Sequence, residues 1–390
     1  MLKNLKSLDK NVWLLGILSF SADLASQMVY PLLPQFMLEL GANGRIIGLI
    51  EGIAEAAASL LRAVFGKLSD KWQNRKGFIW MGYGLAALAK PILFIATSAY
   101  HILGIRFLDR LGKAVRSPAR DALMSLSIDK KQRGLAFGYH RAMDRLGAIG
   151  GPLLAIWVLG LTNENLREVF LWAAVPGLLG LLVLFLVKEK SIPVSLFKKE
   201  NTQSLKHNPK FQVFFWANVL FALGNSSNAF LILKAQETGI ALTMIPLVWM
   251  VYNAFCTISS PIFGGFSDRY GRKDMIGISF IFYGLLYLLF AFAQFPWEIW
   301  SLFAGYGIYY GLSHGVSKAY IADLVAEDQR ATAYGVFTTG TGIALLPASL
   351  IMGFLWDLAS SQWAFIFSAV MAILGFLVWV LGERMTVESL

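Results

Sequence analysis

The ten residues Gly264–Lys273, GGFSDRYGRK, form a short basic turn between two long apolar runs, and the rest of the chain is organised around this turn. A related stretch, GKLSDKWQNRK at Gly66–Lys76, lies 198 residues earlier, about half of the 390-residue chain. A second pair has nearly the same separation, because QRGLAFG at Gln132–Gly138 recurs 197 residues later as QRATAYG at Gln329–Gly335. Two matches at one offset indicate a duplicated unit.

The composition places this duplicated unit in a lipid bilayer. Hydrophobic residues make up 56% of the chain and charged residues 15%, and the apolar residues fall in runs of about 20, the length of a membrane-spanning helix. Only helices and closed barrels satisfy every backbone group in lipid, and the runs do not alternate as barrel strands do. The net charge of +10 comes from basic residues in the loops between runs, so it indicates topology and not nucleic-acid binding. The single cysteine, Cys256, forms no internal disulfide.

We predict an all-α membrane protein with twelve transmembrane helices in two pseudo-symmetric six-helix bundles. The expected spans are approximately 11–40, 46–66, 78–98, 101–125, 134–160, 168–187, 211–234, 243–264, 275–294, 299–324, 332–356 and 362–382. Residues 1–187 would form the N-terminal bundle, 188–210 a cytoplasmic linker and 211–390 the C-terminal bundle. Basic residues cluster in alternate connections, which by the positive-inside rule puts both termini in the cytoplasm, with the chain in the plasma membrane, in bacteria the inner membrane. These residues include Lys3, Lys6, Lys10, Lys67, Lys71, Lys76, Lys130, Lys131, Arg133, Lys188, Lys190, Lys198, Lys199, Lys206 and Lys210.

The pattern G-x-x-x-D-R-x-G-R-K in Gly264–Lys273 resembles the signature loop of the major facilitator superfamily of secondary transporters, and the resemblance extends over the whole chain. The first copy departs from it, with Gln73 and Asn74 where the family has Gly and Arg. The resemblance implies that family's fold and a gate, in which each turn's aspartate contacts the N-terminal end of a helix in the opposite bundle. The alternative is that both turns only set topology. Asp121 is expected to pair with Arg75, since Asn74 carries no charge. The residues assigned to gating are Gly66, Asp70, Arg75, Asp121, Gly264, Asp268, Arg269 and Arg272.

Ionisable side chains within the spans are candidates for function, because a charge in the membrane is costly unless it is paired or hydrated. Most of them lie in the first half of the chain, which predicts ion coupling in the first bundle and an apolar, aromatic wall in the second. Glu51, Glu55 and Arg62 fall on one face of the second span. Arg106 resembles a fourth-helix arginine that the family links to proton coupling. The residues assigned to proton coupling are Asp23, Glu51, Glu55, Arg106, Asp109, Arg110, His140 and Asp144. The alternative is a static ion network.

The fifth span places His140 and Asp144 on one helical face with two glycines of GAIGGP, Gly147–Pro152. The glycine-proline portion resembles the fifth-helix motif of drug/proton antiporters, where missing side chains permit tight packing and a kink. Glycine-rich packing without antiport is the alternative. Asp144 is expected to pair with Arg110 or Arg106 of the fourth span. Because the reference pKa of histidine is near neutral, His140 would either relay protons or serve as a satisfied structural histidine.

The stretch DLASQMVYP at Asp23–Pro31 resembles a motif of a subgroup of bacterial facilitators that are mostly exporters, with Gln27 in place of a glutamate. The corresponding part of the seventh span, LGNSSNAF at Leu223–Phe230, is polar but uncharged. Polar interruptions in corresponding helices of two halves indicate a central binding site. The residues assigned to substrate binding are Asp23, Gln27, Tyr30, Asn225, Asn228, Lys234, Trp249, Tyr252, Tyr309 and Tyr310. For the four last aromatic residues, ordinary packing is the alternative.

The sequence has no G-x-x-x-x-G-K-[ST] phosphate loop, so we expect an ion gradient to supply the energy for transport. We predict a monomeric secondary transporter and not an enzyme, driven by protons without a cofactor or a metal. Protonation of Asp23, Glu55 and Asp144, tuned by Arg106, would change which arrangement of the bundles is favoured. The fifth span favours efflux of drug-like or amphiphilic compounds by antiport. The alternative is a carrier of organic anions, uptake included, because basic residues outnumber acidic ones within the first bundle.

Overall fold

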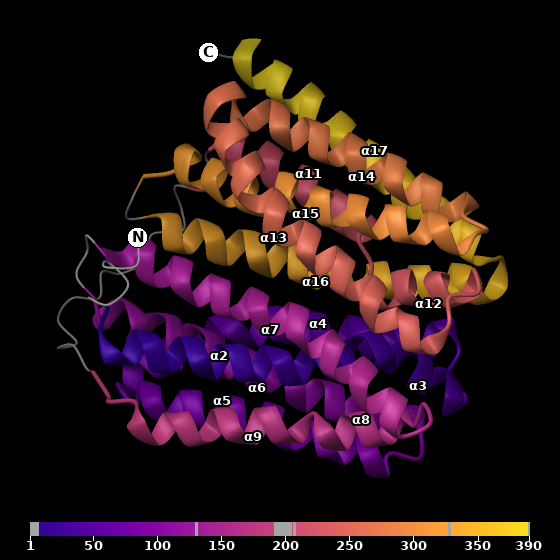
Figure 1. Cartoon of the computed structure of the whole chain (residues 1–390). Coiled ribbons are helices and arrows are strands. Elements are labelled where there is room, and N and C mark those ends of the chain that lie inside the picture. Colours follow the sequence, from indigo (N-terminus) through magenta and orange to yellow (C-terminus); the bar gives the residue numbers. More distant parts are fainter. Residues whose placement is uncertain (1–7, 129–131, 191–204, 206–207, 327–328, 389–390) are drawn as a thin grey trace. The chain divides into compact units, whose positions relative to one another are not determined.

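A computed structural model describes residues 8–128, 132–190, 205, 208–326 and 329–388. Within these residues the helices form twelve successive stretches, which confirms the predicted fold class (Figure 1). Most of the predicted linker lies outside the described residues. So do the basic residues Lys3, Lys6, Lys130, Lys131, Lys198, Lys199 and Lys206.

The first six stretches are α2 (Lys10–Val29) with η1 (Tyr30–Leu32) and α3 (Leu33–Glu39), α4 (Gly44–Trp72), α5 (Arg75–Ile92) with η2 (Leu93–Ile95), α6 (Ala99–Leu126), α7 (Arg133–Leu161), and α8 (Leu166–Trp172) with α9 (Ala174–Val183) and η4 (Leu184–Leu186). The other six are α11 (Pro209–Gly224) with α12 (Ala229–Glu237), η6 (Leu242–Met244) with α13 (Ile245–Tyr270), α14 (Arg272–Phe292), α15 (Pro296–Leu324), α16 (Arg330–Leu358) and α17 (Ser361–Glu388). Both α4 and α13 run on into the turn motif, beyond the ends that the apolar runs predict.

Eight of the described stretches are long and apolar enough to cross a membrane by themselves. The stretches of α4, α6, α11 with α12, and α15 are not among them. In α6 the reason is its many charged side chains, and α11 and α12 are two short helices separated by a polar segment. A helix with as many charged side chains as α6 is stable in a bilayer only where other helices cover it.

Backbone geometry repeats between the two halves of the chain. Gly41 and Gly239 both have left-handed φ angles, +81° and +88°, just after corresponding helices. Gln73 and Gly271 also correspond, with φ of +52° and +102° in the two copies of the basic turn. The first helix of each half is interrupted as predicted, at the turn that begins with Tyr30 and between α11 and α12. These shared features support the duplication read from the sequence.

The chain divides into two compact units. The N-terminal unit comprises Met1–Gly41, Ala57–Phe197 and Ala241–Met250, and the C-terminal unit comprises Ala42–Ala56, Lys198–Ile240 and Val251–Leu390. In the N-terminal unit α2 packs along α7 and α5 along α6, whereas in the C-terminal unit α17 packs against both α11 and α14.

Glycines set how closely the helices of the N-terminal unit approach. A Cβ atom on Gly147 would lie 2.6 Å from the carbonyl oxygen of Phe20, and one on Gly151 would lie 2.6 Å from that of Leu24. These distances are too short for any side chain. The tight packing predicted for the fifth span is therefore confirmed, and it brings His140 and Asp144 of α7 against the polar face of α2.

Candidate functional site

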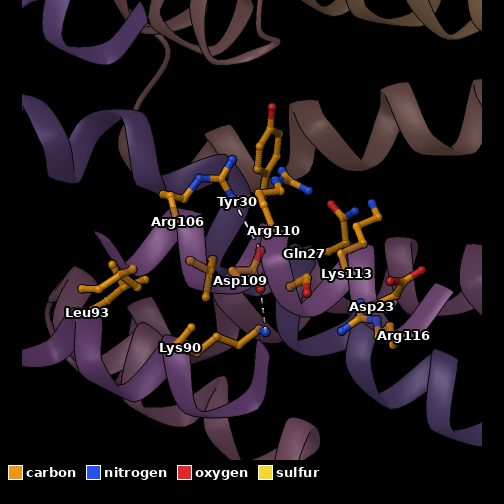
Figure 2. Close-up of a pocket in the computed structure, with 14 residues that line it drawn as sticks. Asp23, Gln27, Tyr30, Lys90, Leu93, Arg106, Asp109, Arg110, Lys113 and Arg116 are labelled. Carbon is orange, nitrogen blue, oxygen red and sulfur yellow. Dashed lines mark ion pairs between the residues drawn. The ribbon is translucent and has the colours of Figure 1, made fainter. Parts of the chain in front are cut away.

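The N-terminal unit holds a polar cavity of about 80 Å³ lined by residues of α2, η1, α5, η2 and α6 (Figure 2). Basic side chains outnumber acidic ones in its lining by five to two. The charged residues are Lys90, Arg106, Arg110, Lys113 and Arg116, with Asp23 and Asp109. A cavity of this volume has room for several water molecules or for one small anionic group.

One part of the cavity is built around Asp109, whose carboxylate lies between two cations (Figure 2). Its Oδ1 is 3.6 Å from Lys90 Nζ, and its Oδ2 is 3.8 Å from Arg106 Nη1. Lys90 is buried and also donates a 2.7 Å hydrogen bond to the carbonyl oxygen of Ala86. These groups satisfy one another, as intramembrane charges must.

Another part is dominated by Arg116, which is only 6% exposed. Its guanidinium lies 4.3 Å above the ring of Tyr83, but its Nε and Nη1 have no hydrogen-bond partner among the residues that the structure describes. Close approach of α5 and α6 fixes this position, because a Cβ on Gly82 would lie 2.5 Å from both Arg116 Cβ and the Gly112 carbonyl oxygen. Unsatisfied buried donors are costly, and charge-assisted bonds to an anionic ligand would satisfy them. Asp23 interacts electrostatically with Arg116 across the cavity lining.

The structure brings together the predicted substrate residues of the first span. Asp23, Gln27 and Tyr30 all line the cavity. Trp249, which belongs to the same unit, donates a 2.7 Å hydrogen bond from Nε1 to Gln27 Oε1, and its ring lies 5.1 Å from that of Tyr30. Four residues assigned to proton coupling line the same cavity, namely Asp23, Arg106, Asp109 and Arg110.

Five of the predicted substrate residues of the second half belong to a cluster of tyrosines and asparagines in the C-terminal unit, namely Asn225, Asn228, Tyr252, Tyr309 and Tyr310. Asn225 accepts a hydrogen bond from Tyr283, at 3.3 Å, and Asn228 accepts one from Tyr306, at 2.8 Å. The ring of Tyr252 stacks on that of Tyr306 at 5.2 Å. The remaining predicted aromatic residues, Tyr309 and Tyr310, contact the rings of this cluster.

Lys234 lies in a different place in the C-terminal unit. It lines a pocket of about 380 Å³ at the ends of α12 and α14 and the start of α17. Its Nζ is 3.4 Å from Glu237 Oε1 and 3.5 Å from Ser361 Oγ. The lysine is therefore held in a local ion pair outside the tyrosine cluster.

The predicted proton-coupling residues fall into separate groups. Glu51 and Glu55 both belong to the C-terminal unit, where Glu51 is buried and accepts a 3.1 Å hydrogen bond from Ser227. Asp144 pairs with His140, 3.4 Å from Nδ1, so the prediction that Asp144 pairs with Arg110 or Arg106 is wrong. The helical spacing of four residues already places these two groups side by side.

Each basic turn closes an ion pair of its own. Asp70 pairs with Arg75 at 3.3 Å, and Asp121 pairs with Arg120 at 2.9 Å, so the predicted pair of Asp121 with Arg75 is wrong. The left-handed turn at Gln73 folds the chain back, and this brings Arg75 to Asp70.

In the second copy of the turn, Arg272 bonds both Asp268, at 2.9 Å, and Asp323. Among the other gating candidates, Arg269 lies over the ring of Tyr270, Gly66 faces Pro118, and Gly264 borders open space. A gating role for these residues stays a prediction.

Two uncharged residues near the cavity were missed in the sequence, Ser19 and Tyr83. Ser19 Oγ lies 2.8 Å from His140 Nε2 and 3.0 Å from the Tyr83 hydroxyl. A serine and a tyrosine in apolar runs carry no signal by themselves. Lys90 had a signal, since a lysine within an apolar run needs a partner. Among the described residues there is no group of three or more His, Cys, Asp or Glu side chains that could hold a metal ion.

Comparison with known proteins identifies the family. The sequence profile of the Major Facilitator Superfamily matches residues 15–233 and 214–389. The chain belongs to the major facilitator superfamily. This facilitator is 38% identical over 379 residues to the uncharacterized MFS-type transporter MJ1317 of Methanocaldococcus jannaschii. The aligned region covers 95% of this chain and 94% of that protein. It is therefore a multi-pass membrane transporter.

More distant matches show how broadly the facilitator fold is shared. The multidrug resistance protein MdtG of Salmonella paratyphi C is 26% identical over 297 residues, 72% of each chain. The nucleoside transporter NupG superposes with a TM-score of 0.77 over 96% of this chain and 99% of its own, at 17% identity. A POT family transporter in complex with 5-aminolevulinic acid gives a TM-score of 0.81 over 96% of each chain, at 13% identity. At these identities the two solved structures show the fold alone.

Proposed function

We propose that this facilitator is a proton-coupled carrier of small organic anions that works by alternating access. The observation that carries this proposal is the cavity of the N-terminal unit, with five basic side chains against two acidic ones. Asp109 contacts two of the cations, Lys90 and Arg106, whereas Arg116 keeps two buried donor atoms without a partner in the described part of the chain. A carboxylate or phosphate group of the substrate would accept those bonds.

Transport and not catalysis is the proposed activity, and a proton gradient is its proposed energy source without a cofactor. Asp23, Glu55 and Asp144 are the carboxylates proposed to take part in coupling, because a proton added to such a carboxylate, or to a group paired with it, changes which conformation is favoured. We further propose a monomer in the plasma membrane, in bacteria the inner membrane, with both termini in the cytoplasm, since the basic residues cluster in alternate connections. The basic turns with Asp70 and Asp268 are proposed as the gate.

Proton-driven efflux of drug-like or amphiphilic compounds is the second candidate function. Its support is the likeness to the multidrug resistance protein MdtG and the tight glycine packing of α7. A lipophilic cation would need an unpaired carboxylate in the cavity. Asp109 has two cationic partners, and Asp23 faces several basic side chains, so the charge balance favours the anion.

Reconstituted vesicles test the proposed function directly. With an imposed proton gradient, wild-type protein should accumulate organic anions such as mono- and dicarboxylates or sugar phosphates, and Arg116→Gln should lower the rate by about 100-fold or more, the loss expected for a desolvated charged contact. Arg384→Gln is the matched control, because Arg384 is an exposed arginine near the end of α17. Proton-driven movement of lipophilic cations, with no movement of anions, would contradict the proposal and support efflux.

A further inference from the structure

Ser19, His140 and Asp144 form a continuous hydrogen-bonded line between α2 and α7 in the N-terminal unit. Asp144 Oδ2 is 3.4 Å from His140 Nδ1, and His140 Nε2 is 2.8 Å from Ser19 Oγ. Ser19 and His140 are both at least 97% buried. The glycine contact of α7 with α2 at Phe20 produces this arrangement, because a side chain at Gly147 would push the two helices apart.

Tyr83 of α5 joins this line to the cavity. Its hydroxyl is 3.0 Å from Ser19 Oγ, and its ring lies beneath the guanidinium of Arg116, 4.3 Å away. Arg120, one turn after Arg116 on α6, donates from Nη1 to both Ser19 Oγ, at 3.0 Å, and the Tyr83 hydroxyl, at 3.4 Å. Tyr83 therefore contacts both the hydrogen-bonded line of Ser19, His140 and Asp144 and the arginine that the proposed anion would bind.

The order Ser19, His140, Asp144 is also that of a nucleophile, its base and the group that orients the base. A hydrolytic site does not fit these surroundings. Ser19 is buried, it is absent from the cavity lining, and its oxygen already has three polar neighbours. A substrate carbonyl has no room to approach the Ser19 oxygen. A proton can still move along the existing hydrogen bonds, because this movement requires no additional space.

The hydrogen-bond inventory allows two arrangements of this network. With neutral His140, Nδ1–H donates to Asp144 and Nε2 accepts the Ser19 hydrogen, so that Ser19 accepts from Tyr83 and Arg120. When a proton is added at Nε2, that N–H donates to Ser19 Oγ. Ser19 still accepts from Arg120, but its own hydrogen turns to the Tyr83 oxygen. The Tyr83 hydroxyl hydrogen then loses its acceptor on Ser19, and the added proton remains on His140.

We infer that His140 carries the coupled proton and that Tyr83 is the positioning residue that links its protonation to anion binding at Arg116. This inference rests on the proposed function, and it assigns a coupling route to the same cavity. The added charge on His140 attracts the anion, so anion affinity rises as the pH falls, and by reciprocity the bound anion favours the proton. Proton and anion then move together.

Asp144, the ion-pair partner of His140, belongs to a wider network of charged and titratable groups on the helices packed together here. The other members of this network are Asp23 of α2, Tyr83 of α5, Lys113, Arg116, Arg120 and Asp121 of α6, and Arg141 of α7. Histidine is the residue type in this set whose reference pKa lies near neutral. Asp144 holds the imidazole in place through its 3.4 Å contact with Nδ1.

Tyr83→Phe is the sharpest test, because it keeps the ring beneath Arg116 and removes only the hydroxyl. Tyr139→Phe is the matched control, since the Tyr139 hydroxyl donates to the Trp13 carbonyl oxygen, at 3.5 Å, and takes no part in the network of Ser19 and Tyr83. Two readouts are compared in vesicles, namely anion exchange without a proton gradient and anion accumulation driven by one. We expect Tyr83→Phe to retain exchange and to lose accumulation by on the order of tenfold, and to weaken the tightening of anion binding from pH 8 to pH 6. Tyr139→Phe should behave as wild type.

His140→Gln provides a second variant and should show the same split between exchange and accumulation. Equal exchange and equal accumulation in wild type, Tyr83→Phe and His140→Gln would overturn the coupling route while leaving the proposed function intact. Loss of both activities in folded Tyr83→Phe, checked by its melting temperature, would also overturn it, because Tyr83 would then serve binding alone. Absence of both activities in the wild type would instead contradict the proposed function.

Discussion

The two units share a duplicated framework but bury different polar groups. In the N-terminal unit the buried polar groups include four basic side chains, those of Arg75, Lys90, Arg106 and Arg116. In the C-terminal unit they are mostly hydroxyls and amides, with Glu51 and Lys234 as the buried charges among the described residues, and the rings of Tyr283 and Tyr287 stack at 4.0 Å. Phenols stay neutral at physiological pH, whereas ion pairs respond to an added charge. Most of the buried charged side chains of the described residues therefore lie in the N-terminal unit, beside the proposed anion site, whereas the C-terminal unit holds the cluster of buried tyrosines.

Removing a charge from the N-terminal unit should produce the largest loss of stability. Asp109→Asn leaves the buried Lys90 without its carboxylate partner, and breaking a buried ion pair costs about 3 kcal/mol or more. We expect the melting temperature in detergent to fall markedly. The double variant Lys90→Met with Asp109→Asn should recover much of the loss, because no uncompensated lysine remains. A melting temperature equal to wild type in Asp109→Asn would show that the pair is not essential.

Removing a hydroxyl from the C-terminal unit should have a smaller effect. The Tyr283 hydroxyl donates to the Gly224 carbonyl oxygen at 3.1 Å, at the break between α11 and α12. Tyr283→Phe leaves this buried carbonyl with one bond fewer, which costs about 1–2 kcal/mol. Thermal unfolding measures the loss, with the exposed Tyr270→Phe as the matched control. An equal effect of the two substitutions would contradict a specific role for the hydroxyl.

The two basic turns offer the finest comparison. Gly271 has φ of +102°, outside the left-handed region that side chains tolerate, so Gly271→Ala should destabilise by about 1–2 kcal/mol. Gln73 has φ of +52°, and its side chain bonds the Asp70 carbonyl and Arg75. Gln73→Gly should change stability by less than about 0.5 kcal/mol, because relief of backbone strain offsets the lost bonds. Thermal unfolding of the two variants measures the difference, and equal losses would contradict this account.

The sequence predicted the framework because its causes are local. Apolar runs define the helices, and Pro31 and the polar stretch after Gly224 mark the interruptions seen in the first helix of each half. The close contact of α7 with α2 followed from the glycines of Gly147–Pro152. In each case one short stretch of sequence determines the feature.

Ion-pair partners were not predictable in the same way, because they depend on which helices are neighbours and on the angle of each side chain. Arg75 was matched to Asp121 by charge alone, but the left-handed Gln73 turns it to Asp70. Ser19 and Tyr83 became candidates only once the structure showed how the helices pack. This packing places the Ser19 hydroxyl against His140 and the hydroxyl of Tyr83, and the Tyr83 ring against Arg116. Nothing in their local sequence distinguishes them from packing residues.

The central claim is that the cavity of the N-terminal unit binds an anionic group through Arg116. Thermal unfolding of the purified protein tests it most directly, at pH 6 and pH 8, with small mono- and dianionic metabolites and with lipophilic cations as ligands. We predict that an anion raises the melting temperature of the wild type, more at pH 6 than at pH 8, and leaves that of Arg116→Gln unchanged. Stabilisation by lipophilic cations in place of anions, stronger at pH 8 and insensitive to Arg116→Gln, would contradict the claim.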